Sequence, residues 1–306
     1  MTMIETSGLT KEYGDVTAVT NVDLTVERGD IHGFVGHNGA GKTTTMQMLT
    51  GLVTPTRGEA YIGGDPAGTR AATRKIGYAP QDPAFYESMT GRDYLTYMGK
   101  LSAVEGSARD RADELLERLD LTEAADQAVE GYSGGMLRRL AVGQAMLGDP
   151  ELLILDEPTA ALDPEGRAMI IDALETLTDD GTTIFVSSHV LTELEQFIDT
   201  VTFLKEGEVV TSGPLAEVLS STAADRYIVD ASNNDRLADL LADQESVSGI
   251  DRADDGELVV TTDDPEAFAV ALPRVLSDAN LGLYSVDREG GLEERFLDIL
   301  DDGGEE

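Results

Sequence analysis

Residues 36–43 have the types and spacing of a phosphate-binding loop. They read Gly-His-Asn-Gly-Ala-Gly-Lys-Thr and fit G-x-x-x-x-G-K-[ST] without a mismatch. Glycines let the backbone curl, so that successive N–H groups point inward and wrap a β-phosphate. Lys42 places a charge against the β- and γ-oxygens, and the Thr43 hydroxyl ligates Mg²⁺. The expected nucleotide contacts are Gly36, His37, Asn38, Gly39, Ala40, Gly41, Lys42, Thr43 and Thr44.

The alternative for this loop is a chance glycine-rich turn between a strand and a helix. An apolar run precedes the loop at residues 31–35, and a helical pattern follows it at residues 43–49. This context favours the loop of a nucleoside triphosphate site, where the start of the helix adds its positive end.

A second candidate group of residues follows the apolar run at 152–155. Asp156 and Glu157 come directly after it and precede Pro158. A phosphate-loop protein needs an acid at the end of a neighbouring strand to hold Mg²⁺ through water. Asp156 is placed for that role, and Glu157 is placed to polarise the attacking water as a general base. An acid at a strand end is common in α/β proteins, but two adjacent acids downstream of a phosphate loop favour the catalytic interpretation.

A third motif, Tyr132-Ser133-Gly134-Gly135-Met136, precedes a predicted helix. Ser133 is a good N-cap, and the two glycines permit close backbone approach at a helix N-terminus. Alone, this motif is no more than a flexible turn. In its position between the phosphate loop and the acidic strand, it resembles the signature of the ATP-binding subunits of ABC transporters. The resemblance covers roughly residues 3–215 and implies binding and hydrolysis of ATP.

The resemblance implies roles for four further residues. Gln81 matches the Q-loop glutamine that touches Mg²⁺, and His189 matches the switch histidine that contacts the γ-phosphate. Asp163 matches the D-loop, which crosses to the other subunit. Tyr13 sits where the family stacks an aromatic ring on adenine. Taken singly, these residues have ordinary alternatives: a loop Gln, one of three His, a turn Asp and a core Tyr.

The family geometry also implies partners. A homodimer or a pseudo-symmetric pair would sandwich ATP, with Ser133, Gly134 and Gly135 of one copy acting in trans on the other. A separate transmembrane permease subunit would hold the chain at the inner face of the cell membrane as a peripheral cytoplasmic protein. Residues 83–97 are apolar enough to contact that permease, although core packing explains them equally well.

Short features point to one branch of the family. Met136 followed by Arg138 and Arg139 resembles the drug-efflux, daunorubicin-resistance type of ATPase, as does the run at residues 292–297. The expected function is therefore to power an exporter. Two alternatives are weighed against it: a soluble ABC ATPase acting in translation or on DNA, and a module that binds nucleotide without turnover. Glu157 and His189 argue against the second of these.

Alternating strands and helices must position these residues, and they predict an α/β domain with a parallel sheet. The expected fold is a P-loop NTPase domain over residues 1–220, with a mixed parallel sheet and a helical subdomain at about 82–148. Its strands are expected at 22–26, 31–35, 152–155 and 182–186, and its helices at 43–49, 109–119, 137–147 and 165–177.

Residues 225–306 contain no phosphate-binding motif and predict a small accessory α+β domain. The expected order is βαββαβ followed by a helix at 292–300, which is the ferredoxin-like arrangement. Its strands are expected at 227–230, 247–251, 257–262 and 283–287, with helices at 235–241 and 265–277.

Composition limits the class of protein. The 306 residues carry a formal net charge of −37, and 41% are hydrophobic. At molar salt the Debye length shrinks to about 3 Å, so such a surface suits the cytosol of a halophile, although an ordinary acidic protein is the alternative. The charge argues against nucleic acid as a partner. The absence of Cys excludes disulfides and thiolate metal sites. Neither a membrane-spanning run nor a secretory signal is visible.

Overall fold

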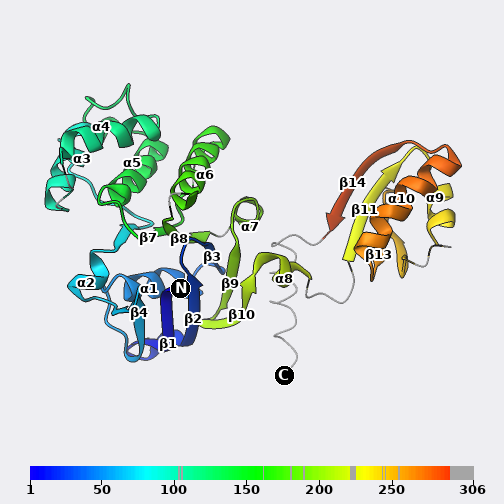
Figure 1. Ribbon diagram of the computed structural model, residues 1–306, viewed down its shortest axis with the longest axis horizontal. Helices are drawn as coiled ribbons and strands as arrows, with labels where there is room; N and C mark the ends of the chain where they lie inside the picture. Colours follow the sequence, from blue (N-terminus) through cyan, green and yellow to red (C-terminus); the bar gives the residue numbers. More distant parts are fainter. Residues whose placement is uncertain are drawn as a thin grey trace. The chain divides into compact units, whose positions relative to one another are not determined.

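The computed structural model describes most of the chain (Figure 1). The described residues are 1–102, 104, 106–160, 162–179, 181–188, 190–220, 225–242, 244, 246–253 and 256–289. The chain divides into two compact units, Met1–Leu215 and Ala216–Glu306, and each has its own hydrophobic core. In the part of the chain that the structure describes, none of the helices has both the length and the apolar composition needed to cross a bilayer.

A six-stranded sheet forms the centre of the first unit. In order across the sheet, its strands are β10 (Glu208–Pro214), β9 (Thr200–Lys205), β3 (Ile31–Val35), β8 (Thr183–Ser188), β7 (Leu152–Asp156) and β6 (Ile76–Ala79). All are parallel except β10, which runs antiparallel at one edge. Every residue of β3, β7 and β8 is buried, because parallel strands are covered on both faces. The predicted parallel sheet is confirmed.

A second, antiparallel sheet lies in the same unit and was not predicted. Its order is β2 (Val16–Glu27), β1 (Thr2–Tyr13), β4 (Arg57–Ile62) and β5 (Asp65–Pro66). The two opening strands predicted at 22–26 and 31–35 are confirmed as parts of β2 and β3, but the sequence analysis missed β1, which precedes them. Register shifts along the β1–β2 pair interrupt the apolar–polar alternation of β1, and Gly8 has a φ of 57° within it. The period of two that identifies a half-buried strand is therefore broken.

Helix α1 (Lys42–Leu49) packs between the two sheets. Its buried Met46 and Leu49 share one core cluster with Phe34 of β3, Leu24 of β2 and Ile62 of β4. Burying a helix between two sheets fixes its position firmly, since interiors are close-packed. The loop that joins β3 to α1 is therefore held at both ends by the core.

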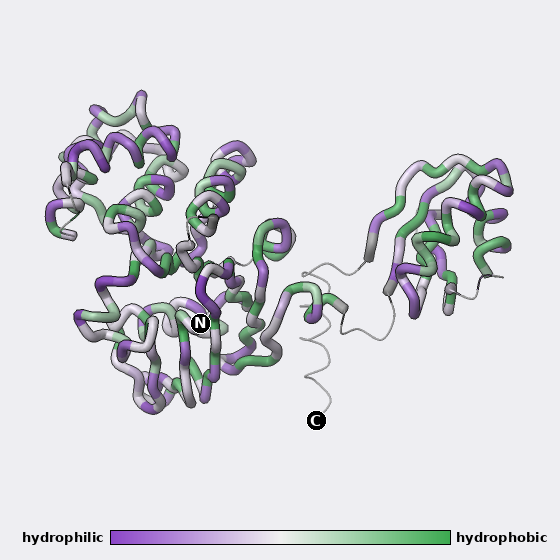
Figure 2. Tube along the Cα trace, viewed as in Figure 1, coloured by the Kyte–Doolittle hydropathy of each residue, from purple (hydrophilic) through white to green (hydrophobic). Residues whose placement is uncertain are grey.

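The remaining helices of the first unit lie around the two sheets, with three of them grouped together (Figure 1). They are α2 (Arg70–Thr73), α3 (Gly91–Leu101), α4 (Ala108–Arg118), the 3₁₀ turn η1 (Val129–Gly131), α5 (Gly134–Met146), α6 (Pro164–Asp179) and α7 (Leu191–Leu194). Helices α3, α4 and α5 pack on one another, and α5 also packs on β6 and β7. The hydroxyls of Thr90, Ser107 and Ser133 cap α3, α4 and α5, which explains where these helices begin. Hydrophilic residues recur along α4 (Figure 2).

Helix α8 (Leu215–Ser220) begins at the last residue of the first unit, and the second unit contains a four-stranded antiparallel sheet. Its elements follow in the order β11 (Asp225–Ala231), α9 (Asn234–Leu241), β12 (Gly249–Arg252), β13 (Leu258–Thr262), α10 (Pro265–Ala279) and β14 (Leu283–Glu289). The sheet order β12-β13-β11-β14 puts β11 and β13 at the centre. The predicted order βαββαβ is confirmed. The predicted helix at 292–300 lies outside the described residues.

Candidate functional site

The loop between β3 and α1 requires its glycines for steric reasons. A Cβ at Gly36 would lie 2.5 Å from the carbonyl oxygen of Leu204, and one at Gly41 would lie 2.5 Å from that of Ala18. Gly39 and Gly41 also have φ values of 85° and 104°, which lie in the left-handed region. The spacing read from the sequence therefore corresponds to backbone that other residues could adopt only with strain.

The end of this loop is shaped to receive an anion. Gly41 is the N-cap residue of α1 and provides no side-chain hydrogen bond, so the first N–H groups of the helix have no cap from that residue. Helix N-termini attract anions through these N–H groups and the helix dipole.

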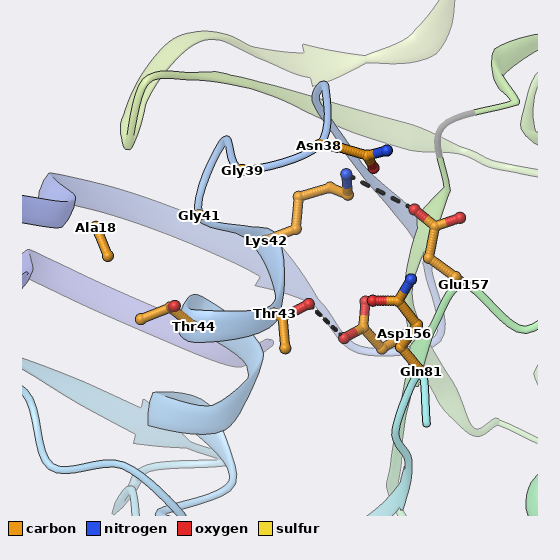
Figure 3. A pocket seen from close by; sticks show the side chains of 10 residues that line it. All are labelled: Ala18, Asn38, Gly39, Gly41, Lys42, Thr43, Thr44, Gln81, Asp156 and Glu157. Atoms are coloured by element: carbon orange, nitrogen blue, oxygen red, sulfur yellow. Dashed lines mark hydrogen bonds and ion pairs between the residues drawn. The ribbon is translucent and has the colours of Figure 1, made fainter. Parts of the chain in front are cut away.

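Lys42 is buried, and its ammonium group lies over the loop (Figure 3). Nζ donates to the carbonyl oxygens of Gly36 at 2.6 Å and His37 at 3.3 Å, and it lies 3.7 Å from Oε1 of Glu157. The side chains of Lys42 and Glu157 are only 7% and 4% exposed. A buried ammonium group held among oxygen atoms is a strong point charge for a phosphate group.

Asp156 ends β7 and is joined to α1 and β8 by hydrogen bonds. Its Oδ2 accepts from the Thr43 hydroxyl at 2.7 Å, and its Oδ1 accepts from the Ser187 hydroxyl at 2.6 Å. The residue is 1% exposed. Burying a carboxylate is costly unless it is hydrogen-bonded, so these two hydroxyls stabilise its charge and fix both oxygens.

Glu157 has an uncommon backbone conformation. Its φ is 55°, in the left-handed region that non-glycine residues seldom occupy. Its backbone N–H donates to both the carbonyl oxygen and the hydroxyl of Ser187, at 3.2 and 3.0 Å. Such strain persists only where the surroundings impose it, and it clusters at functional sites. Here the turn directs the Glu157 carboxylate toward Lys42 (Figure 3).

These groups line one pocket of about 170 Å³. It brings together most of the predicted phosphate, metal and acid residues. The lining residues are Ala18, Asn38, Gly39, Gly41, Lys42, Thr43, Thr44, Gln81, Asp156 and Glu157. Gln81 comes from the segment after β6, and its side chain lines the same pocket as Asp156 (Figure 3). The Thr43 hydroxyl, the Gln81 amide and the Asp156 carboxylate thus line one pocket.

Other predicted residues of the first unit lie outside that lining. Gly36 and Ala40 are buried residues of the loop itself. His37 is exposed, and its Nδ1 hydrogen-bonds to the carbonyl oxygen of Asn38. Tyr13 ends β1 and is 48% exposed, with Lys11 Nζ 4.9 Å from its ring centroid.

The signature motif lies at the exposed N-terminus of α5. Ser133 is confirmed as the N-cap, since its hydroxyl accepts from the Met136 N–H at 3.3 Å. A Cβ at Gly134 would meet nothing within 4 Å, whereas one at Gly135 would lie 3.2 Å from Leu162. Asp163 accepts from the N–H of Gly166 at 2.9 Å at the start of α6. His189 lies outside the described residues.

Two residues that support the site were not assigned to it from the sequence, although Arg138 was noted as a feature of one branch of the family. Ser187 pairs with Asp156 in the parallel register of β7 and β8. Only its place at the carboxyl end of β8 could have indicated it. Arg138 of α5 donates through Nη1 to the carbonyl oxygen of Gln81 at 2.5 Å and to that of Pro80 at 3.4 Å. No local sequence signal marks that long-range contact.

Burial and the charge of Asp156 both affect the pKa values of Arg138 and Tyr78. Burial lowers the pKa of Arg138, whereas the carboxylates of Asp82, Glu157 and Asp156 oppose that change. An arginine remains charged under these conditions. Burial and the charge of Asp156 raise the pKa of Tyr78 to about 12, so Tyr78 stays neutral.

The donor set fits Mg²⁺ held together with a phosphate. Among the described residues, no group of three or more His, Cys, Asp or Glu side chains could hold a metal by itself. Mg²⁺ is usually bound through one or two carboxylates plus substrate phosphates rather than by an all-protein cage. The adjacent oxygens of Thr43 and Asp156 satisfy that requirement.

Known proteins share these sequence features. A family model described as ABC transporter matches residues 19–160. The daunorubicin resistance ATP-binding protein DrrA3 of Streptomyces coeruleorubidus is 36% identical over 98% of this chain and 96% of its own length. The linearmycin resistance ATP-binding protein LnrL of Bacillus subtilis is 37% identical over 74% of each chain. The bacitracin transport ATP-binding protein BcrA of Bacillus licheniformis is 40% identical over 70% of each.

Solved structures share the fold of the first unit. The ATP-binding cassette MJ0796, in a dimeric post-hydrolysis state bound to ADP and Pi, is similar with a TM-score of 0.65 and 27% identity. The alignment covers 70% of this chain and 99% of that one. An ATP-binding subunit of an ABC transporter is similar with a TM-score of 0.65 and 28% identity, over 71% of this chain and 91% of that one.

Proposed function

This chain belongs to the ABC transporter family as an ATP-binding subunit with ATPase activity, and from that premise we propose that it drives an exporter through a separate permease. One observation carries the proposal. The Lys42 ammonium, the Thr43 hydroxyl and the carboxylates of Asp156 and Glu157 meet in a single pocket at the carboxyl edge of the parallel sheet. Ligands of open α/β sheets bind at that edge.

We assign the residues of the pocket as follows. The N–H groups of residues 36–44 and the Lys42 ammonium bind the β- and γ-phosphates. Thr43, Gln81 and Asp156 hold Mg²⁺, which when bound offsets negative charge on the phosphate oxygens. Glu157 accepts a proton from the attacking water as the bond to the γ-phosphorus forms and the β–γ bridging bond breaks, which leaves ADP and phosphate. His189 contacts the γ-phosphate, and Tyr13, whose ring is half exposed, stacks on adenine.

A second copy of this chain, or a paired ATPase subunit, completes the site. Ser133, Gly134 and Gly135 would close over the γ-phosphate of the facing copy, and Asp163 would lie at the same interface. The open space around Gly134 supports this assignment, because another molecule can approach that backbone closely. The dimeric cassette MJ0796 supports the arrangement by similarity. ATP stabilises the closed pair because its γ-phosphate reaches both halves.

The permease would dock beside Gln81. Within residues 83–97, Tyr94 and Leu95 are buried, whereas Tyr86 and Tyr97 are 56% and 40% exposed and stack edge to face at 5.7 Å. The segment thus includes both core residues and a surface aromatic pair that suits a partner. Docking would hold the chain on the cytoplasmic face of the membrane.

The relatives support transport of a small toxic molecule in the direction of export. Their names describe daunorubicin and linearmycin resistance and bacitracin transport, and the role of this chain is coupled to transport rather than to translation or DNA. Residues 1–220 would form the ATP-binding domain, with residues 82–148 as its helical subdomain, and residues 225–306 an accessory domain. The charge of −37 supports a protein adapted to a halophile's cytosol.

The decisive experiment compares Glu157→Gln with the wild-type chain in molar KCl. The variant is expected to bind ATP normally, to lose turnover by about 10²-fold or more and to remain dimeric in ATP, because only the general base is removed. Lys42→Ala is the control, and it should weaken nucleotide binding by about tenfold or more through loss of a charged hydrogen bond. Normal turnover in Glu157→Gln would exclude Glu157 as the base.

A further inference from the structure

Arg138 links helix α5 to the segment that carries Gln81. Its Nη1 donates to the Gln81 carbonyl oxygen at 2.5 Å and to the Pro80 carbonyl oxygen at 3.4 Å. Gln81 lies two residues after β6 ends and enters the pocket with its side chain. The hydrogen bonds from Arg138 therefore fix the backbone on which the Gln81 amide depends.

Electrostatics keep the guanidinium in this place. Arg138 is partly buried, and the carboxylates of Asp82, Asp156 and Glu157 all stabilise its charge. A guanidinium is planar and presents several donors in a fixed geometry, so one side chain can serve two successive carbonyl oxygens. The shorter, rotating ammonium of lysine is a poorer match to that arrangement.

Arg138 is also five residues after Ser133 on the same helix. The N-terminus of α5 carries the exposed motif that we assign to the facing copy, and α5 packs on β6, which precedes Gln81. A shift of α5 would therefore carry the guanidinium with it and displace the Gln81 backbone. The neighbouring Arg139 serves a different purpose, since it donates to the carbonyl oxygens of Leu119 and Asp120 at the end of α4.

We infer that Arg138 is a positioning residue for ATP hydrolysis. It holds the Gln81 backbone, so that the position of helix α5 determines where the Gln81 side chain lies in the pocket. The inference rests on the proposed function, because it assigns to Arg138 the task of relaying closure of the pair to the Mg²⁺ and phosphate site. Contact with a facing copy at Ser133 would move α5, and Arg138 would move Gln81 with it.

The test is Arg138→Gln in the full chain, with Arg138→Lys as the conservative variant and Arg109→Gln as the charge-matched control. Arg109 is exposed on α4, in the same group of helices. In Arg138→Gln, kcat should fall about tenfold and the Mg²⁺ concentration for half-maximal activity should rise about tenfold, the size expected when a hydrogen bond to a charged group is lost. Arg138→Lys should recover part of both losses, and Arg109→Gln should match the wild type.

Two measurements separate positioning from general destabilisation. ATP affinity without Mg²⁺ should stay within about twofold of the wild type, because the phosphate loop and Lys42 are unchanged. Amide hydrogen exchange in residues 80–90 of the nucleotide-free protein should become faster in Arg138→Gln, since the backbone loses its tether. Wild-type exchange in that segment, or a wild-type Mg²⁺ midpoint, would overturn the inference.

The proposed function fails in a different way. If the wild-type chain hydrolyses ATP and Glu157→Gln does not, the assignment of the catalytic pocket stands whatever Arg138→Gln does. If the wild-type chain with its permease shows no hydrolysis, both the function and the role of Arg138 are overturned. If hydrolysis is normal in both the wild type and Arg138→Gln, only the role of Arg138 is overturned.

Discussion

Replacing Ser187 with alanine tests how the acid pair is held in place. The Ser187 hydroxyl donates to Oδ1 of Asp156 at 2.6 Å and accepts from the N–H of Glu157 at 3.0 Å. In Ser187→Ala the Asp156 carboxylate loses that donor and keeps its bond from Thr43. Glu157 keeps the bond to the Ser187 backbone carbonyl, so its strained backbone is held by one acceptor instead of two.

The expected size of the effect follows from these contacts. A hydrogen bond to a charged group contributes about 1.5–3 kcal/mol, and the Asp156 bond is of this kind. A loss of about 2 kcal/mol corresponds to roughly 30-fold, because each 1.4 kcal/mol is about tenfold in an equilibrium or rate constant. We therefore expect kcat/KM for ATP in the presence of Mg²⁺ to fall roughly 30-fold.

The assay measures phosphate release against Mg²⁺ and ATP in molar KCl, with nucleotide binding measured separately without Mg²⁺. Binding without Mg²⁺ should change less than about twofold, because Ser187 does not touch the phosphate loop. Thr202→Val is the matched control. It removes a fully buried hydroxyl of β9, in the same sheet, whose partners are His32 and Ser212 rather than the acids.

Both variants should lower the melting temperature by similar amounts, since each loses buried hydrogen bonds. Only Ser187→Ala should weaken Mg²⁺-dependent turnover. Equal kinetic losses in the two variants would show that the effect is general destabilisation. Unchanged turnover in Ser187→Ala would refute the argument that this hydroxyl positions Asp156 and Glu157.

Two further predictions concern stability. His32 is buried and hydrogen-bonds to the hydroxyls of Thr200 and Thr202. Burial lowers its pKa from 6.5 to about 3. Between these two pH values His32 is therefore neutral in the folded chain but protonated in the unfolded chain. The wild type therefore loses stability as pH falls from 6.5 toward 3. Its stability advantage over His32→Gln at pH 7 should shrink by roughly 2–3 kcal/mol at about pH 4.5, as measured by urea unfolding followed by circular dichroism. The second prediction is that raising KCl from about 0.1 M to about 1 M, which shortens the Debye length from ~10 Å to ~3 Å, relieves the repulsion of a chain with net charge −37. If this contributes about 2 kcal/mol, the melting temperature should rise by about 4–8 °C, and a flat or falling melting temperature would contradict adaptation to salt.

The sequence predicted those parts of the site that follow from local pattern. The phosphate loop, the apolar strand before Asp156 and the N-cap at Ser133 each depend on neighbours within one turn or strand. The structure confirms the strands before the loop and before Asp156, and it confirms the N-cap. Burial of a strand on both faces gives a continuous apolar run that is easy to identify. The order of elements in the second unit was predictable for a related reason, since each strand and helix has its own local period.

The features that the sequence did not reveal depend on pairings between distant segments. Strand β1 pairs with both β2 and β4, but its register shifts disguise its period. Ser187 becomes a partner of Asp156 only once β7 and β8 are aligned. Arg138 meets Gln81 only after α5 has packed on β6. Such contacts are set by tertiary packing, which a period or a propensity does not encode.

Salt should screen the surface charges of this chain much more than the buried charges of its site. Exposed carboxylates repel through water, and ions screen that repulsion within a Debye length of about 3 Å at molar salt. Lys42 and Asp156 are buried, and their contacts of 2.6–3.7 Å exclude ions from the space between the partners. Buried pairs are screened far less than exposed ones. The salt that is expected to stabilise the fold should therefore leave the charge arrangement around the phosphate loop intact. Screening of the exposed carboxylates would also weaken their repulsion of the negatively charged ATP.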